Sequence, residues 1–389
     1  VWKLGQKAYG STKKLVFYSI RKIFYPFSKS KINKVFIAAP ESASEQIIEI
    51  KKRCDFYTPD LAVEVVKIAR KGTLPLKTAF APEPLLILGH KQLKPLWIYN
   101  YRGGIFKVDY LHNSDDGGEW HKLLNYVSDR SNDYLLESKN RFVRRVEELQ
   151  KESLNKCYIF GTGPSLEQAI NRNWSDGYRV VCNTIVRDSE LWKHLDPHFI
   201  VAGDSIYHFG CTTFAKTFRK DLAERLSESQ AMFIYPALFH NLVIREFSNL
   251  ADRLVPIPKK HHKKINVNLM RKFELPNLGN VLAVLHLPVA CTLSNNIYLF
   301  GFDGRAPDDK LFWSNSSKHT YLEFMEELKI AHPHFFKYNV PQNNPQKYIR
   351  EVHGDMLDRK MTEAENEGWK FIMLHKSWTP MLQKRYVQE

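Results

Sequence analysis

A glycine-rich turn at residues 161–166 sets the strongest limit on the fold of this chain. The turn, Gly-Thr-Gly-Pro-Ser-Leu, follows an apolar run at 157–160 and precedes a helix-like stretch, an order that predicts strand, tight turn and helix N-terminus. Glycine lets a backbone turn sharply and approach a ligand closely. A helix N-terminus offers unpaired N–H groups and the positive end of a dipole, which favour phosphate. Ser165 can cap this helix, so the turn predicts a site for a nucleotide or a nucleotide sugar.

Apolar runs alternate with helix-like stretches from residue 155 onward. This alternation predicts an α/β fold whose sheet is mostly parallel, with helices on both faces. In such a sheet, ligands bind beyond the carboxyl ends of the strands, where the glycine-rich turn is expected to lie. The expected strands are residues 156–160, 179–182, 199–202, 231–235, 297–300 and 369–374, and the clearest expected helices are 280–291, 320–331 and 355–367.

The chain before residue 153 has a different pattern and carries no chemical motif. We expect a basic, aromatic leader at residues 1–34, an accessory α/β domain at 35–152 and a larger nucleotide-binding domain at 153–389. The elements expected between residues 34 and 153 are a strand at 34–39, a helix at 42–54, a second helix near 60–71, short strands at 85–88 and 96–99, a polar loop at 113–118 and a charged amphipathic helix at 132–153.

The leader is strongly basic and rich in aromatic residues. Residues 1–34 contain nine Lys or Arg and no Asp or Glu. This composition favours an anionic membrane surface, where each positive charge contributes about 1 kcal/mol. Nucleic acid could use the same charge, but no DNA- or RNA-binding signature occurs, so we expect a membrane surface and no nucleic acid. A solvated leader, or an arm that docks on another subunit, are the alternatives. The interleaved aromatic residues are Trp2, Tyr9, Phe17, Tyr18, Phe24, Tyr25 and Phe27.

The charge, the length of the apolar runs and the cysteines of the whole chain argue against a membrane-spanning protein and against a structural zinc site. The formal net charge is +15, and no apolar run reaches the roughly 18 residues that a membrane-spanning helix needs. Five cysteines are scattered without C-x-x-C pairs, which argues for reduced thiols and against a structural zinc site. We therefore expect a cytoplasmic protein held at the inner face of the membrane. Because the leader begins without methionine, we also expect a fragment of a longer chain.

Polar residues recur near the ends of the other expected strands. Taken singly each is an ordinary turn residue, because Asn, Asp and Gly are common in turns. Taken in order along the chain, they point to one site at the carboxyl edge of the sheet. The residues that these segments bring to that edge are Asn183, Asp204, Gly279, Asn280, Asp303, Arg305 and His353.

This ordered set resembles the bacterial sialyltransferases of glycosyltransferase family 42 and the related motility-associated glycosyltransferases, over about residues 155–380. Those proteins have Gly-Asn-Gly-Pro-Ser-Leu after the opening strand, Cys-Asn after the second strand, a Ser-Gly-Ile-Asp turn and a late catalytic His. The corresponding segments here are 161–166, 182–183, 300–303 and 353–354. The resemblance implies a Rossmann-like sheet of the GT-A-like variant with a lid. It also implies a CMP-activated ulosonic acid as donor substrate, with no metal and no other cofactor.

The resemblance implies a role for each matching residue. His353 would be the general base that deprotonates the acceptor hydroxyl, since a histidine pKa lies near working pH. Arg305 stands where the family has a phosphate-contacting tyrosine, and its guanidinium would neutralise the leaving phosphate. In-line displacement would invert the anomeric carbon. The residues that would bind the nucleotide are Gly161, Thr162, Gly163, Pro164, Ser165, Asn183, Asp204, Gly279, Asn280 and Asp303.

Three departures from the family pattern bear on the donor. Thr162 replaces the family asparagine in the first turn. Asp204 replaces a second asparagine, and since a carboxylate repels phosphate, it would face the ribose hydroxyls or the cytosine amine. The expected lid, residues 308–338, has no clear counterpart of a second phosphate-binding tyrosine. The donor sugar therefore stays open among sialic acid, another nonulosonic acid and Kdo.

The expected function is an inverting, metal-independent transfer of the ulosonic acid to a cell-surface glycan or glycolipid, as in capsule or lipooligosaccharide synthesis. One alternative is a pterin-type pyrophosphokinase, which would need ATP and magnesium. Another is a non-catalytic nucleotide-binding module of a capsule assembly complex. Asp303 with Asp308 and Asp309 could also be read as a metal-binding cluster, but they lack an Asp-x-Asp spacing, and Asp-Gly at 303–304 is typical of a turn.

Overall fold

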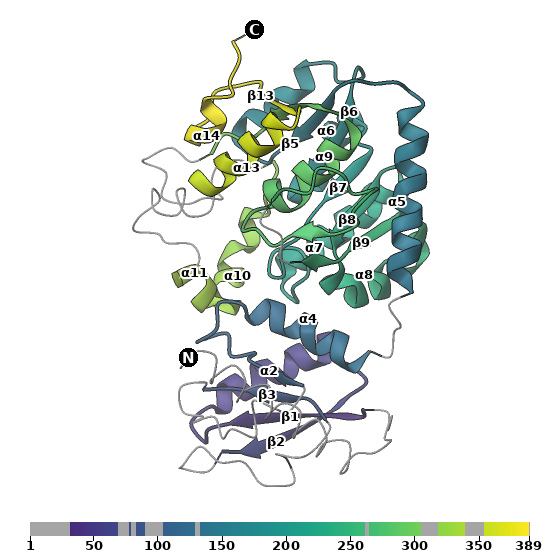
Figure 1. Ribbon diagram of the computed structural model, residues 1–389. Helices are drawn as coiled ribbons and strands as arrows, with labels where there is room; N and C mark the ends of the chain where they lie inside the picture. Colours follow the sequence, from purple (N-terminus) through teal and green to yellow (C-terminus); the bar gives the residue numbers. More distant parts are fainter. Residues whose placement is uncertain are drawn as a thin grey trace, which may run out of the picture. The chain divides into compact units, whose positions relative to one another are not determined.

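The computed structural model describes residues 32–68, 78, 83–89, 104–128, 133–260, 264–304, 318–338 and 354–388 (Figure 1). The chain forms two compact units, Val1–Asp129 and Arg130–Glu389. Residues 1–31 of the basic leader, the expected strand at 96–99, and both proposed catalytic residues, Arg305 and His353, lie outside the described residues. Within the part that is described, no helix is long and apolar enough to cross a bilayer.

The first unit contains a four-stranded parallel sheet in the order β2-β1-β3-β4. Its core includes Trp120, which stacks on Tyr57 with 5.1 Å between ring centroids. The elements are β1 (Lys34–Ala39), α2 (Ser44–Tyr57), β2 (Ala62–Lys67), β3 (Leu85–Ile87), β4 (Ile105–Phe106) and α4 (Asp116–Val127).

Two expectations for the first unit are wrong. The expected helix near 60–71 contains strand β2 instead, because Val63, Val65 and Val66 favour a strand and the segment pairs with β1. The expected polar loop at 113–118 contributes its last three residues to α4. Asp116 is fully buried there, because its carboxylate accepts a hydrogen bond from Arg53 Nη1 at 2.9 Å.

The second unit is built on a seven-stranded sheet in the order β13-β12-β5-β6-β7-β8-β9, in which every neighbouring pair is parallel. The expected α/β fold with a mostly parallel sheet is thus confirmed, and it is consistent with a Rossmann-like architecture. The strands are β5 (Cys157–Phe160), β6 (Tyr178–Cys182), β7 (Phe199–Val201), β8 (Met232–Pro236), β9 (Leu254–Ile257), β12 (Asn296–Phe300) and β13 (Lys370–Met373).

Helices and turns cover both faces of this sheet (Figure 1). On one face a buried apolar cluster joins the strands to α5, α9 and α13. On the other face Trp174 packs edge-on against Phe160 and Phe300. The helical segments are α5 (Tyr134–Gln150), η2 (Pro164–Asn171), η3 (Asn183–Arg187), α6 (Ser189–Leu195), α7 (Thr213–Ser227), η4 (Ala237–Phe239), α8 (His240–Glu246), η5 (Ser248–Arg253), η6 (Leu282–His286), α9 (Leu287–Leu293), η7 (Leu322–Phe324), α10 (Met325–Ala331), α11 (Pro333–Tyr338), α13 (Asp355–Asn366) and α14 (Pro380–Gln383).

Helix α5 belongs to the larger unit, which therefore begins earlier in the chain than expected. We expected the larger domain to begin at residue 153, but the compact unit begins at Arg130 and includes α5. Phe142 and Val146 of this helix are fully buried in the apolar cluster of the seven-stranded sheet. The Ser138 hydroxyl donates to the Pro256 carbonyl at 2.9 Å. The helix is therefore part of the larger core.

Strand β9 was not expected from the sequence. It contains Pro256, which has no N–H to donate and is tolerated mainly in edge strands. In the structure β9 is an edge strand that pairs on one side with β8. A short pair, β10 (Lys259–Lys260) and β11 (Leu275–Pro276), follows it and was also missed.

The order of the strands creates a switch point between β5 and β12. From β5 the chain adds β6, β7, β8 and β9 in sequence toward one edge. It then returns to the other side of β5 with β12, and adds β13 beyond it. In open parallel sheets of this kind, ligands bind outside the carboxyl ends of the strands at such a point. The glycine-rich turn after β5 and the loop after β12 both lie there.

Candidate functional site

Two glycine-containing loops meet at the switch point. The N–H of Gly161 donates to the Phe300 carbonyl at 2.8 Å, and the N–H of Gly163 donates to the Gly301 carbonyl at 2.8 Å. A Cβ atom added to Gly161 would lie 2.5 Å from the Gly301 oxygen. Gly301 has a φ of +77°, a conformation that glycine adopts without strain. These glycines are thus required by the close approach of the two loops themselves.

Asp303 caps the helix that follows the first turn. Its carboxylate accepts hydrogen bonds from the Ser165 N–H at 3.2 Å and from the Ser165 hydroxyl at 2.9 Å. We expected Ser165 to be the cap, but the N-cap position of η2 belongs to Gly163, and the capping oxygen comes from a residue 138 positions away. A carboxylate is favoured there for the same reason as a phosphate. A phosphate bound at Ser165 would therefore have to displace Asp303.

His375 joins the two loops to the end of β13. Its Nε2 accepts the Gly301 N–H at 2.9 Å, and Nδ1 lies 2.8 Å from the Lys376 carbonyl. Because a carbonyl can only accept, Nδ1 carries the proton in this contact, while Nε2 is the acceptor. Its Nε2 also lies 3.0 Å from the Ser165 hydroxyl oxygen. Sequence reasoning missed His375, although its place directly after the last expected strand was a signal that could have found it.

Ser377 fixes the loop after β12 from the same direction. Its hydroxyl donates to the Phe302 carbonyl at 2.7 Å. The N–H of Trp378 donates to the Asp303 carbonyl at 2.7 Å. The loop that carries Asp303 is therefore held by β5 on one side and by the segment after β13 on the other.

Asn183 presents an unsatisfied oxygen at the carboxyl end of β6. It is the first residue of η3 and has a φ of +49°, a left-handed conformation that asparagine adopts more readily than most residues. Its side-chain Oδ1 is buried and has no hydrogen-bond partner among the described residues. Leaving a buried acceptor unpaired costs about 1–3 kcal/mol. The oxygen is therefore suited to accept a hydrogen bond from a ligand that reaches this strand end.

Asp204 organises the turn after β7. Its Oδ1 accepts the N–H groups of Ile206 at 2.8 Å and Tyr207 at 2.9 Å, which is a capping arrangement. Its own N–H donates to His208 Nδ1 at 3.1 Å. Burial, with a smaller effect of the Arg219 charge, lowers the pKa of His208 to about 3, so this ring stays a neutral acceptor. The contacts of Asp204 described here are thus within its own loop.

Asn280 begins the helical segment that crosses the sheet near the switch point. Its Oδ1 accepts the Ala283 N–H at 2.8 Å at the start of η6, a short π-helix, and the preceding Gly279 is exposed. Leu285 in this segment lies 3.0 Å from the position of a Cβ atom added to Gly203, which follows β7. The segment thus extends to the carboxyl edge of the sheet.

Some of the expected site residues are linked by hydrogen bonds, whereas others share only their position at the carboxyl edge of the sheet. Hydrogen bonds link the 161–165 turn to the 301–303 loop, as described above. Pro164 is the first residue of η2, and Thr162 is half-buried beside it. Asn183 and Asp204 lie at the ends of successive strands β6 and β7. Their side chains make no described contact with the two glycine loops.

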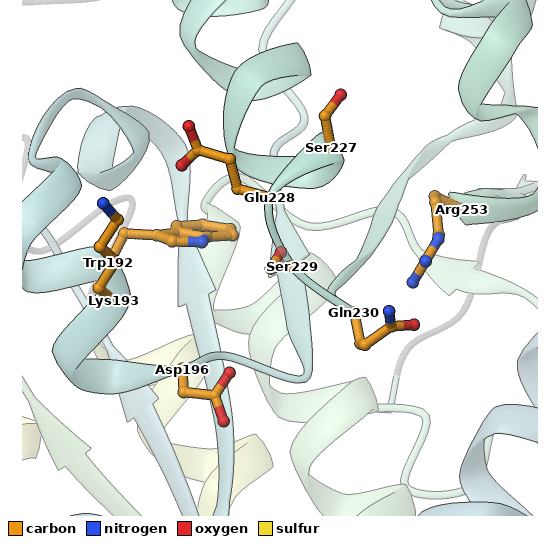
Figure 2. A pocket seen from close by; sticks show the side chains of 8 residues that line it. All are labelled: Trp192, Lys193, Asp196, Ser227, Glu228, Ser229, Gln230 and Arg253. Atoms are coloured by element: carbon orange, nitrogen blue, oxygen red, sulfur yellow. The ribbon is translucent and has the colours of Figure 1, made fainter.

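A surface pocket of about 390 Å³ lies at the amino ends of the strands, opposite the carboxyl ends that carry the candidate site (Figure 2). Its residues come from the ends of α6 and α7 and from the segments that lead into β7, β8 and β9. Those segments are at the amino ends of the strands, away from the switch point, so the pocket is not part of the candidate site. Its lining residues are Trp192, Lys193, Asp196, Ser227, Glu228, Ser229, Gln230 and Arg253.

No protein-family model, no curated protein and no solved structure matches the chain. Within the described ranges, no group of three or more His, Cys, Asp or Glu residues is placed to hold a metal ion. The five cysteines are free thiols, and burial raises the pKa of Cys157 and Cys182. Those two thiols pack as small core residues.

Proposed function

We propose that this protein is an inverting, metal-independent glycosyltransferase with a GT-A-like variant of the Rossmann-like fold. It transfers an ulosonic acid from a CMP-activated donor to a glycan or glycolipid acceptor. The observation that carries the proposal is the meeting of the two glycine loops at the switch point between β5 and β12. This is where a sheet of this order binds nucleotides, and the resemblance to family 42 supplies the donor class.

Asn183 is the residue we assign first to the donor. Its unsatisfied Oδ1 can accept a hydrogen bond from a ribose hydroxyl. The 161–165 turn lies beside it in the order of the sheet, at the end of β5. In the structure the Asp303 carboxylate already accepts the hydrogen bond of the Ser165 hydroxyl. The phosphate of the CMP-sugar therefore competes with that carboxylate.

The chemistry requires a base for the acceptor and a cation for the leaving group. His353 is the proposed base, and Arg305 is the proposed partner of the leaving phosphate; both assignments rest on the resemblance. Replacing His353 by Ala should abolish transfer, because the acceptor hydroxyl would keep its proton, while CMP binding stays unchanged. Turnover equal to that of the wild type would remove His353 from the mechanism.

The proposed place of action is the cytoplasmic face of the membrane, with residues 1–34 as the tether. Their basic and aromatic composition supports this proposal. Deleting residues 1–34 should weaken binding to vesicles that contain anionic lipid, and added salt should weaken binding of the full chain in the same way. Equal binding by the truncated chain would refute the tether.

Calorimetric titration with CMP, UDP and ATP in the presence of EDTA tests the proposed function. Binding of CMP without metal, with UDP and ATP much weaker, is the expected result. A requirement for magnesium together with a preference for ATP would favour the pyrophosphokinase alternative. Binding of CMP without transfer from any CMP-sugar would favour a non-catalytic module.

A further inference from the structure

His286 is a fully buried histidine with two unsatisfied nitrogens. Neither Nδ1 nor Nε2 has a hydrogen-bond partner in the described part of the chain, and the side chain is 0% exposed. Burial lowers the pKa of His286 to about 3, so the ring is neutral and offers one donor and one acceptor. Buried polar groups are nearly always paired, and an exception of this kind calls for an explanation.

The backbone around His286 is also unusual. The residue ends η6, where the N–H of Leu287 donates to the Leu282 carbonyl, five residues earlier. Pro288 has no N–H for the Val284 carbonyl, and its ring crowds that carbonyl, which explains why the chain widens into a π-turn here. Turns of this type occur frequently at functional sites.

The ring lies next to the candidate site. Its centroid is 5.5 Å from that of Phe302, in an edge-on contact. Phe302 in turn lies 3.0 Å from the position of a Cβ atom added to Gly161. A single side chain, which is half-buried, therefore separates the His286 ring from the glycine-rich turn.

We infer that His286 forms hydrogen bonds with the nucleoside part of the bound nucleotide, which reaches the ring by displacing the Phe302 side chain. The neighbours of His286 along the chain are apolar, with Leu282, Leu285 and Leu287 all buried in the same cluster, and the ring itself contacts Phe302. Bringing a phosphate into such surroundings would be costly, whereas an uncharged base or ribose is admitted more easily. A neutral ring with one donor and one acceptor matches those groups. This inference rests on the proposed nucleotide-binding function.

The test compares two buried histidines that differ in their partners. His198 is also nearly buried with its pKa lowered to about 3, but its Nδ1 accepts the Arg179 N–H at 3.0 Å. It precedes β7, at the amino edge of the sheet. His286→Leu and His198→Leu should therefore have opposite effects on stability and different effects on binding.

We expect His286→Leu to raise Tm by about 2–4 °C, since an unpaired polar group is removed from the core. The same variant should weaken binding of CMP and of cytidine about tenfold each, because the lost contact is to the nucleoside. His198→Leu should lower Tm and leave both affinities unchanged. His286→Gln, which keeps a donor and an acceptor, should retain more affinity than His286→Leu.

Three results would contradict the inference in distinguishable ways. Wild-type affinity of His286→Leu for CMP would overturn the role of His286 and leave the proposed function in place. A loss for CMP with none for cytidine would assign the contact to the phosphate and overturn the nucleoside contact. A wild-type protein that binds neither CMP nor cytidine would overturn the proposed function, and the role of His286 with it.

Discussion

The Asp303 carboxylate occupies the hydrogen-bond donors at the helix N-terminus of the candidate site. Its side chain is 20% exposed and accepts from both the N–H and the hydroxyl of Ser165. Asp303→Asn should lower the free energy of unfolding by about 1–2 kcal/mol, because charge-assisted hydrogen bonds are lost. The same change should raise affinity for CMP roughly tenfold, since a negative charge no longer competes with the phosphate. Urea unfolding measures the change in stability, and calorimetry measures the change in affinity for CMP.

Asp188→Asn is the control, because Asp188 is equally exposed and caps α6 through the Leu191 N–H. This variant should lose stability and keep the affinity of the wild type for CMP. Unchanged CMP affinity in Asp303→Asn would contradict the competition.

Helix α5 shows why one element can belong to a different unit from the one its sequence suggests. Phe142 is fully buried, with its ring centroid 5.8 Å from that of Phe199 in β7, whereas Leu136 on the same helix is 65% exposed. Phe142→Ala should therefore destabilise the seven-stranded unit by about 3–5 kcal/mol, through lost burial and a cavity. Leu136→Ala should change its stability by less than about 0.5 kcal/mol. Urea unfolding monitored by a probe in the sheet measures both. If the sheet unfolds at the same urea concentration in Phe142→Ala as in the wild type, α5 contributes nothing to its core.

Elements were predictable from the sequence where local pattern decides them. The strands of the large sheet other than β9 are apolar runs bounded by turns, and they lie where expected. Strand β9 was missed because Pro256 weakens a strand pattern except at a sheet edge, and only the fold makes it an edge. The glycine turn was found, yet its cap was not. Asp303 and His375 reach Ser165 from 138 and 210 residues away, and no local signal encodes such contacts.

Buried neutral histidines should make the whole molecule sensitive to acid. Burial lowers the pKa of His198, His208 and His286 to about 3 each, against 6.5 for the ordinary group. Between these values the unfolded chain binds more protons than the folded chain, so stability is fully present above about pH 6.5 and is lost as pH falls toward 3. Near pH 5, each fall of one pH unit should lower the free energy of unfolding by about 4 kcal/mol through the three groups together.

Urea unfolding at pH 7.0, 6.0 and 5.0 measures this dependence of stability on pH. His198→Leu should remove about one third of it, although the variant is less stable at pH 7. A midpoint that does not change between pH 7.0 and 5.0 would mean that these rings gain protons without unfolding, and therefore that they are reached by water in the folded protein.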